Sequence, residues 1–161
     1  MPRKNGLSNL IFKLLVKGIQ GCNKYDTRVR AELETLPDGI VIQMGIFPQD
    51  NYIQYTKKNG FVFAVKEKQP DIAILFKNVK NAKKVLLGRE SVEQAFAKHS
   101  ITLKGDIAHA MTLVRIINIV ENYLFPKFMR RNLPELQKEC SSLKIYGHIL
   151  FGRAKPKGVK K

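Results

Sequence analysis

Acidic residues, cysteines and long apolar runs are all scarce in this sequence. Asp and Glu together number 13 among 161 residues, against 29 Lys and Arg. The two cysteines, Cys22 and Cys140, form no Cys-x-x-Cys pair, so the sequence gives no indication of a zinc site or a disulfide framework. No apolar run approaches the roughly 18 residues that a membrane-spanning helix needs. These absences predict a protein of a reducing compartment, the cytoplasm, with no membrane span.

The motifs of common catalytic and nucleotide-binding sites are also missing. The sequence contains no Gly-x-Ser-x-Gly nucleophile elbow, no Gly-x-x-x-x-Gly-Lys-Ser/Thr phosphate loop and no Gly-x-Gly-x-x-Gly fingerprint. His99, His109 and His148 have no metal-binding spacing with one another. We therefore predict that the protein is not an enzyme and that it has no catalytic residue, no cofactor and no metal.

What the chain has in excess is positive charge. The formal net charge is +16, and much of the excess lies towards the two ends of the chain. Such a charge attracts nucleic acid, anionic lipid headgroups or acidic proteins, and it does not by itself choose among them.

The composition is otherwise that of a globular protein, with 44% hydrophobic and 26% charged residues. The length fits one domain. We expect residues 1–37 to form an N-terminal amphipathic helical segment of that domain, residues 38–152 to form its main body, and residues 153–161 to be a disordered basic tail.

Hydrophobic periodicity predicts helices at the start of the chain, then strands, then helices again. We expect Gly18 and Gly21 to end the first helix, and short loops to join the first four strands into an antiparallel meander. The sum is an α+β fold with a mostly antiparallel five-stranded sheet and helices covering one face. The expected elements are helices over 7–19 and 27–36, strands over 40–46, 52–55, 61–65 and 71–76, helices over 78–87 and 91–98, a fifth strand over 101–104, a helix over 107–124, a turn or helix over 133–143, and, in addition to the five strands of the sheet, a strand over 144–151.

The helix over 107–124 has an unusually wide apolar arc. Gly105 permits a turn before it, and Asp106 is a good N-cap. The arc must be buried on several sides or must line something apolar that is not protein. Asn118 and Glu121 interrupt its first stripe, so an apolar wall there would end near Ile117. The first stripe is Ile107, Ala110, Met111, Val114 and Ile117, and the second is Leu113, Ile116, Val120 and Leu124.

Several motifs in this order resemble the sterol carrier protein type 2 domain family, in its bacterial type. They are Asp38-Gly39-Ile40-Val41-Ile42, Pro70 to Phe76, Leu87-Gly88-Arg89, Val92 to Phe96, and Ile101 to Asp106. The resemblance implies a non-catalytic apolar tunnel between sheet and helices that holds acyl chains, sterols or other lipids. The segment after Pro126 has no counterpart in the family pattern.

These observations predict a lipid-binding or lipid-carrier protein whose basic ends dock on anionic membranes. The alternative is a basic protein associated with nucleic acid, because Tyr52, Tyr55 and neighbouring aromatic residues would suit base stacking. A third hypothesis is a scaffold that binds a partner protein through residues 7–19. The side chains predicted to bind lipid share apolar bulk and elements that should face the interior: Phe63, Phe76, Phe96, Met111, Val114 and Ile117.

Overall fold

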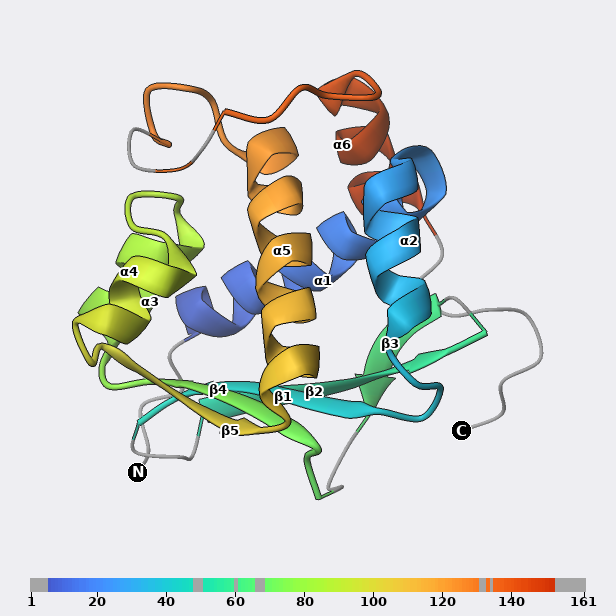
Figure 1. Ribbon diagram of the computed structural model, residues 1–161. Helices are drawn as coiled ribbons and strands as arrows, with labels where there is room; N and C mark the ends of the chain where they lie inside the picture. The colour runs from blue at the N-terminus through green and yellow to red at the C-terminus, as the bar shows by residue number, and fades with distance from the viewer. Residues whose placement is uncertain are drawn as a thin grey trace.

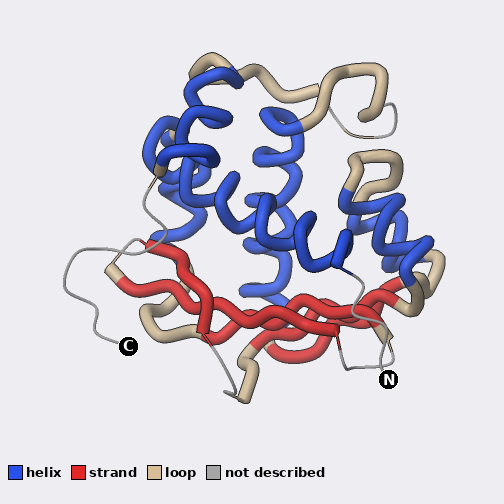
Figure 2. The backbone as a smooth tube through the Cα atoms, turned by 180° about the vertical axis from the view of Figure 1, so that it is seen from behind, coloured by secondary structure: helices blue, strands red, loops and turns tan. Residues whose placement is uncertain are grey.

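A sheet with helices packed on one of its faces makes up the computed structural model (Figures 1 and 2). The structure describes residues 6–47, 51–59, 61–65, 69–130, 133 and 135–152. The predicted turn after residue 47 and the predicted basic tail lie largely outside these ranges. The helices are α1 (Gly6–Tyr25), α2 (Thr27–Thr35), α3 (Val79–Leu86), α4 (Val92–Ala97), α5 (Ile107–Leu124) and α6 (Ser142–Phe151). The strands are β1 (Val41–Ile46), β2 (Asn51–Lys58), β3 (Phe61–Val65), β4 (Ile72–Phe76) and β5 (Ile101–Gly105).

The sheet has five strands in the order β3-β2-β1-β4-β5. Three of its four pairings are antiparallel, but β1 and β4 run parallel, so the sheet is mixed. The predicted five strands, their mostly antiparallel pairing and the single covered face are confirmed. The four-strand meander was wrong, because β4 returns to pair with β1 and not with β3.

Asp71 explains where β4 begins. Its main-chain N–H donates to the carbonyl of Val41 at 2.8 Å, and its carboxylate accepts from the N–H of Val41 at 2.7 Å. These two bonds hold the start of β4 beside the start of β1. The parallel register then follows as the pairs Ile42–Ile72, Met44–Ile74 and Ile46–Phe76.

The core lies between the sheet and the helices. Strand side chains alternate between faces, so the residues paired in that register point to one side, where they are buried. The ring of Phe12 on α1 stacks on that of Phe76, with centroids 6.2 Å apart. The space between the sheet and α1 is therefore filled by large side chains.

Helix α1 continues to Tyr25, so the prediction that Gly18 and Gly21 end it was wrong. Both glycines lie where another helix crosses. A Cβ on Gly18 would lie 2.8 Å from Val120 of α5, and one on Gly21 would lie 3.4 Å from His148 of α6. The missing side chains let three helices approach one another closely.

The corner between β5 and α5 follows the prediction. Gly105 has a φ of +103°, and a Cβ there would lie 1.9 Å from the carbonyl oxygen of Asp71. Only glycine fits this position. Asp106 caps α5 by accepting from the N–H of His109 at 2.9 Å, so this predicted cap is confirmed.

The wide apolar arc of α5 is buried along most of both stripes. Leu113, Ile116 and Val120 of the second stripe and Ala110, Val114 and Ile117 of the first are each at most 2% exposed. The first stripe differs from the prediction. Ile107 is 76% exposed and Met111 37% exposed, because they share with Arg115 a side of the helix that is open to solvent. The predicted core stripe is therefore wrong at Ile107 and Met111 and confirmed at Ala110, Val114 and Ile117.

The segment predicted as a strand over 144–151 is the helix α6. Ser141 caps it by accepting from the N–H of Leu143 at 3.2 Å, and Ile145 and Ile149, one turn apart, are buried. The predicted strand was therefore wrong, since the spacing of Ile145 and Ile149 is that of a helix. None of the described helices is long and apolar enough to cross a membrane.

Candidate functional site

A cavity of about 390 Å³ lies among the helices, on the side of α1 where α6 packs. Its wall comes from the first half of α1, the end of α3, the end of α5 and the second half of α6. The lining residues are Ile11, Leu14, Leu15, Leu86, Leu87, Leu124, Phe125, Tyr146, Ile149 and Leu150.

The spacing of small and large residues on α1 explains why the cavity is there. Gly21 lies against Ile145 and His148, whereas Lys17 reaches Ile149, so α6 runs antiparallel to α1. At Gly21 the two helices touch. Towards the start of α1 the contact residues become leucines and isoleucine, which hold the helices apart and leave a space between them.

The wall is apolar, and the polar groups beside it are paired. Tyr146 is the one lining residue of the ten with a polar side-chain atom, and its hydroxyl donates to the carbonyl of Leu124 at 2.6 Å. The Lys17 ammonium donates to the carbonyl of Ile149 at 3.2 Å. A ligand here would meet a hydrocarbon surface with little hydrogen-bonding capacity of its own.

The cavity opens to solvent between α1 and α6. Leu14, Tyr146 and Leu150 line it and are also exposed, Leu150 to 72%. A side chain that both lines the cavity and meets solvent must lie at its mouth.

The predicted lipid-binding residues are not among those that line this cavity. Phe76, Val114 and Ile117 are buried in the core between sheet and helices. Phe96 is 52% exposed, and Met111 is also exposed, so the expectation that these two face the interior was wrong. Each lies on an outer side of its helix. Phe63 lies in β3 opposite Thr56, and its side chain is outside the described part of the structure.

Two signals in the sequence could have located the cavity. The first is the apolar stripe of the amphipathic helix predicted over residues 7–19, which contains Ile11, Leu14 and Leu15. The contribution of α6 was missed because Ser141 was not recognised as an N-cap and the spacing of Ile145 and Ile149 was not assigned to a helix.

A polar patch follows the apolar part of α5, as the sequence predicted for Asn118 and Glu121. Glu121 is fully buried, and in the described part of the structure neither of its carboxylate oxygens has a hydrogen-bond partner. Burial raises the pKa of Glu121 well above its ordinary value, the negative charge of Glu93 raises it further, and Arg130 opposes both. Burial therefore favours the neutral form of Glu121 in the folded protein.

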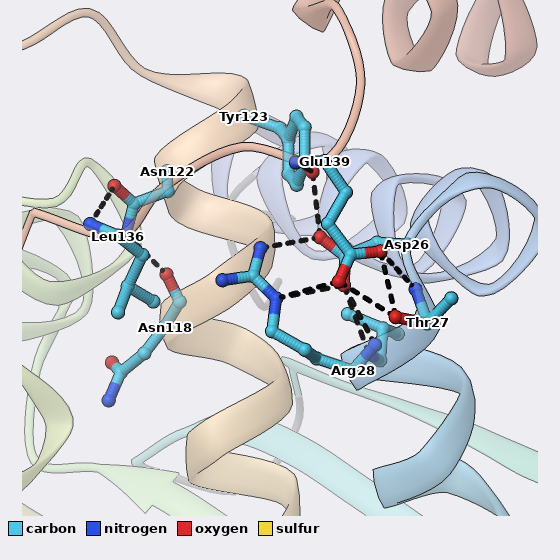
Figure 3. Close-up of polar contacts among 9 residues, drawn as sticks. Asp26, Thr27, Arg28, Asn118, Asn122, Tyr123, Leu136 and Glu139 are labelled. Atoms are coloured by element: carbon cyan, nitrogen blue, oxygen red, sulfur yellow. Dashed lines mark hydrogen bonds and ion pairs between the residues drawn. The ribbon is translucent and has the colours of Figure 1, made fainter.

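The segment that leads into α6 is tied to the helices by a polar cluster (Figure 3). The Tyr123 hydroxyl donates to Asp26 at 2.7 Å and accepts from the N–H of Glu139 at 2.9 Å. The Glu139 carboxylate accepts from the N–H and hydroxyl of Thr27, both at 2.7 Å. Asp26 is buried, and its carboxylate is 2.7 Å from the Arg28 guanidinium. This cluster fixes the position from which α6 starts.

The charge state of Asp26 is set by its partners. Burial alone would raise the pKa of Asp26, but hydrogen bonds from Arg28 and Tyr123 lower it below the ordinary value. The carboxylate is thus ionised at neutral pH, and the cluster serves as a structural tie.

No set of residues suited to metal binding stands out. Within the described ranges, no three His, Cys, Asp or Glu side chains are grouped as a metal site would need. Burial raises the pKa of the Cys22 thiol, which keeps it in the unreactive protonated form.

The aromatic residues considered for nucleic-acid binding do not form an exposed platform in the described part of the sheet. Tyr55 is 1% exposed, and its hydroxyl donates to the sulfur of Met44 in the core. Tyr52 is exposed, and the side chains of Phe61 and Phe63 lie outside the description. Stacking on bases requires an accessible ring, which Tyr55 cannot provide.

No protein-family model matches the chain, and no curated protein matches it. Several solved structures are similar to it. One is the UbiJ-SCP2 ubiquinone synthesis protein, with 15% identity, coverage of 66% of this chain and 96% of that chain, and a TM-score of 0.49. A second is the sterol carrier protein domain 2 of Helicoverpa armigera, with 15% identity, coverage of 66% and 84%, and a TM-score of 0.46.

A third similar structure is a conserved hypothetical protein from Thermus thermophilus, described as possibly a sterol carrier protein. Its identity to this chain is 19%, the coverage is 66% of this chain and 85% of that chain, and the TM-score is 0.44. The names of these similar structures refer to sterol carrier proteins, the group that the sequence motifs resemble.

Proposed function

We propose that the protein is a non-catalytic lipid-binding or carrier protein of the cytoplasm, which holds an acyl chain or a similar apolar ligand in the cavity among α1, α3, α5 and α6. The observation that supports this proposal is the apolar wall of the cavity, together with its opening between α1 and α6. Pockets that bind small molecules commonly have volumes of about 300–1,000 Å³, and this one falls within that range.

The energetics of apolar burial fit a chain-like ligand. Each buried methylene contributes about 0.8 kcal/mol, so about ten methylenes would contribute about 8 kcal/mol. This corresponds to roughly micromolar affinity before the cost of immobilising the chain. Since the wall offers few polar partners, we expect affinity to rise with chain length and to depend little on the head group.

The proposed site lies in a different part of the fold from the predicted lipid tunnel. The predicted tunnel lies between sheet and helices, whereas the described cavity lies one layer further out, between helices. The six side chains predicted to bind lipid stay a prediction, and the experiment below tests both sites. The proposal also includes contact between the basic ends of the chain and anionic membranes.

The direct test is to extract the purified protein with organic solvent, identify bound lipid by mass spectrometry, and then titrate the delipidated protein with a fluorescent dansyl-undecanoic acid. In the variants Ile11→Trp and Leu87→Trp a larger ring would occupy the cavity, and we expect about a tenfold or greater loss of affinity. Ile107→Trp changes an exposed residue away from the cavity and is the matched control.

Met111→Trp separates the two sites, because Met111 belongs to the predicted set and does not line the cavity. Loss of binding in Met111→Trp with normal binding in Ile11→Trp would favour the predicted residues over the cavity. Absence of extracted lipid, together with no binding of the probe by the unaltered protein, would contradict the proposed function.

A further inference from the structure

Large apolar side chains outside the core gather on α6 and on the first half of α1. Leu143 is 77% exposed and Phe151 88% exposed, although both belong to a well-formed helix. Leu10 on α1 is also exposed. Together with Leu14 and Leu150 at the cavity mouth, these three form what we call the mouth surface: Leu10, Leu14, Leu143, Leu150 and Phe151.

Such high exposure of several large apolar side chains is unusual for a surface helix. The exposed apolar residues of α6 follow helical spacing, since Leu143 and Leu150 are two turns apart, with Gly147 between them. A Cβ at Gly147 would meet no atom within 4 Å, so this side of α6 faces open space. Exposed apolar side chains gathered on neighbouring helices in this way indicate a contact site for another molecule or a membrane.

The charged residues on the two helices of the mouth surface are all basic. Neither α1 nor α6 contains Asp or Glu, whereas Lys13, Lys17, Lys24 and Lys144 lie on them. The sequence that follows α6 adds five basic residues between positions 153 and 161. The partner must therefore offer both an apolar layer and negative charge.

A second copy of the chain does not meet that requirement. Two copies joined through this surface would bring their lysines together, and each copy carries a net charge of +16. An anionic bilayer does meet it, because it presents acyl chains beneath a layer of negative headgroups.

We propose that the mouth surface on α1 and α6 docks onto an anionic bilayer, with the apolar side chains among the headgroups and the lysines against the phosphates. In this orientation the cavity opens directly towards the acyl chains of the membrane. This second part rests on the proposed function, because it assumes that the cavity holds lipid. The docking itself does not depend on that assumption.

The docking is tested with variants that leave the cavity wall unchanged. Leu143 and Phe151 do not line the cavity, and the double variant Leu143→Gln/Phe151→Gln removes apolar surface from α6. The matched control is Phe47→Gln/Ile107→Gln, which changes two exposed apolar residues, one just after β1 and one at the start of α5. Co-sedimentation is measured with vesicles of phosphatidylcholine alone and with phosphatidylserine added.

We expect the unaltered protein and the control to bind the phosphatidylserine vesicles, and the α6 variant to bind about tenfold more weakly. Replacing Lys13 and Lys144 by Gln should reduce binding by about fivefold for each lysine. Replacement of Lys58 and Lys104, which are exposed on β2 and β5, should have a smaller effect.

Three results would overturn the proposal: equal binding to both kinds of vesicle, equal binding of the α6 variant and the unaltered protein, or a dimer in sedimentation analysis that the α6 variant abolishes. Titration with dansyl-undecanoic acid in the absence of vesicles reports on the cavity alone. Docking as expected without binding of this probe would contradict the proposed function and leave the docking surface intact.

Discussion

Two apolar regions of this molecule lie on opposite sides of α1 and differ in how they are filled. Between α1 and the sheet, Phe12 stacks on Phe76, and large side chains occupy the space. Between α1 and α6, leucines and isoleucines of similar hydrophobicity surround a cavity of about 390 Å³. Apolar composition alone therefore does not separate a packed core from a binding cavity; what differs is whether side chains fill the space between the elements.

The largest expected difference between the two regions is in stability. Phe76→Ala removes a ring that is 1% exposed, and we expect a loss of about 3–5 kcal/mol in the free energy of unfolding. Leu150→Ala removes a side chain at the cavity mouth, and we expect a change within about 0.5 kcal/mol. Urea denaturation followed by circular dichroism measures both. Similar losses in the two variants would mean that the cavity region is packed like the core.

Gly18 lies where α1 crosses α5, at the boundary of the two regions. Gly18→Ala places a Cβ 2.8 Å from Val120, and we expect a destabilisation of about 1–3 kcal/mol. Gly147→Ala is the matched control, because it lies in α6 with open space around it, and it should stabilise the protein by about 0.5–1 kcal/mol. Thermal unfolding of the two variants should therefore shift in opposite directions. If Gly18→Ala leaves the unfolding temperature unchanged, then α1 and α5 can move apart at this crossing without loss of stability.

Tyr123 connects the body of the protein to the segment before α6. Tyr123→Phe removes the hydroxyl that joins Asp26 to Glu139, and we expect a loss of about 1–2 kcal/mol. Hydrogen exchange should increase in α6 more than in the strands, because only the cavity side depends on this tie. Uniform acceleration across the sheet would contradict this local role. Arg115→Gln, which breaks an exposed ion pair with Glu32, should have the smaller effect.

Glu121 lies where the apolar stripe of α5 ends, and its role can be tested through the pH dependence of stability. The pKa of Glu121 is raised in the folded state. The contribution of this side chain to the free energy of unfolding is therefore complete below the ordinary pKa of 4.5, and it is lost as pH rises towards the folded-state pKa. Glu121→Gln stays neutral, and we expect it to be more stable than the unaltered protein at neutral pH, with the difference shrinking near pH 4. Denaturation at several pH values measures this. A difference that does not change with pH would mean that Glu121 does not titrate in this range.

Local sequence signals were enough for the parts of the fold that local chemistry controls. The turn at Gly105 and the cap at Asp106 were predicted because each depends on a few neighbouring atoms. The cap at Ser141 uses the same chemistry, but the segment over 144–151 was predicted as a strand. Short apolar segments fit both periods, and here the contact of α6 with α1 decides the outcome.

The errors concern contacts between distant parts of the chain. Gly18 and Gly21 read as helix ends because glycine lowers helix propensity, whereas here their contacts with α5 and α6 make them part of a continuous helix. The candidate site was misplaced for the same reason. Its wall combines residues from both ends of the chain, and no periodicity within one segment reports that they meet.

The position of Asp71 also has a consequence for the order in which the chain can assemble. This one residue bonds to Val41 of β1 and lies against Gly105 at the end of β5, so it joins segments about thirty residues away on either side. During synthesis the hairpins β1–β2 and β2–β3 can form early, but one edge of β1 has no partner until β4 has emerged. Exposed strand edges favour aggregation. We expect Asp71→Ala to lower the yield of soluble protein on refolding more than its effect on the folded state would suggest, because this carboxylate guides β4 to the open edge of β1.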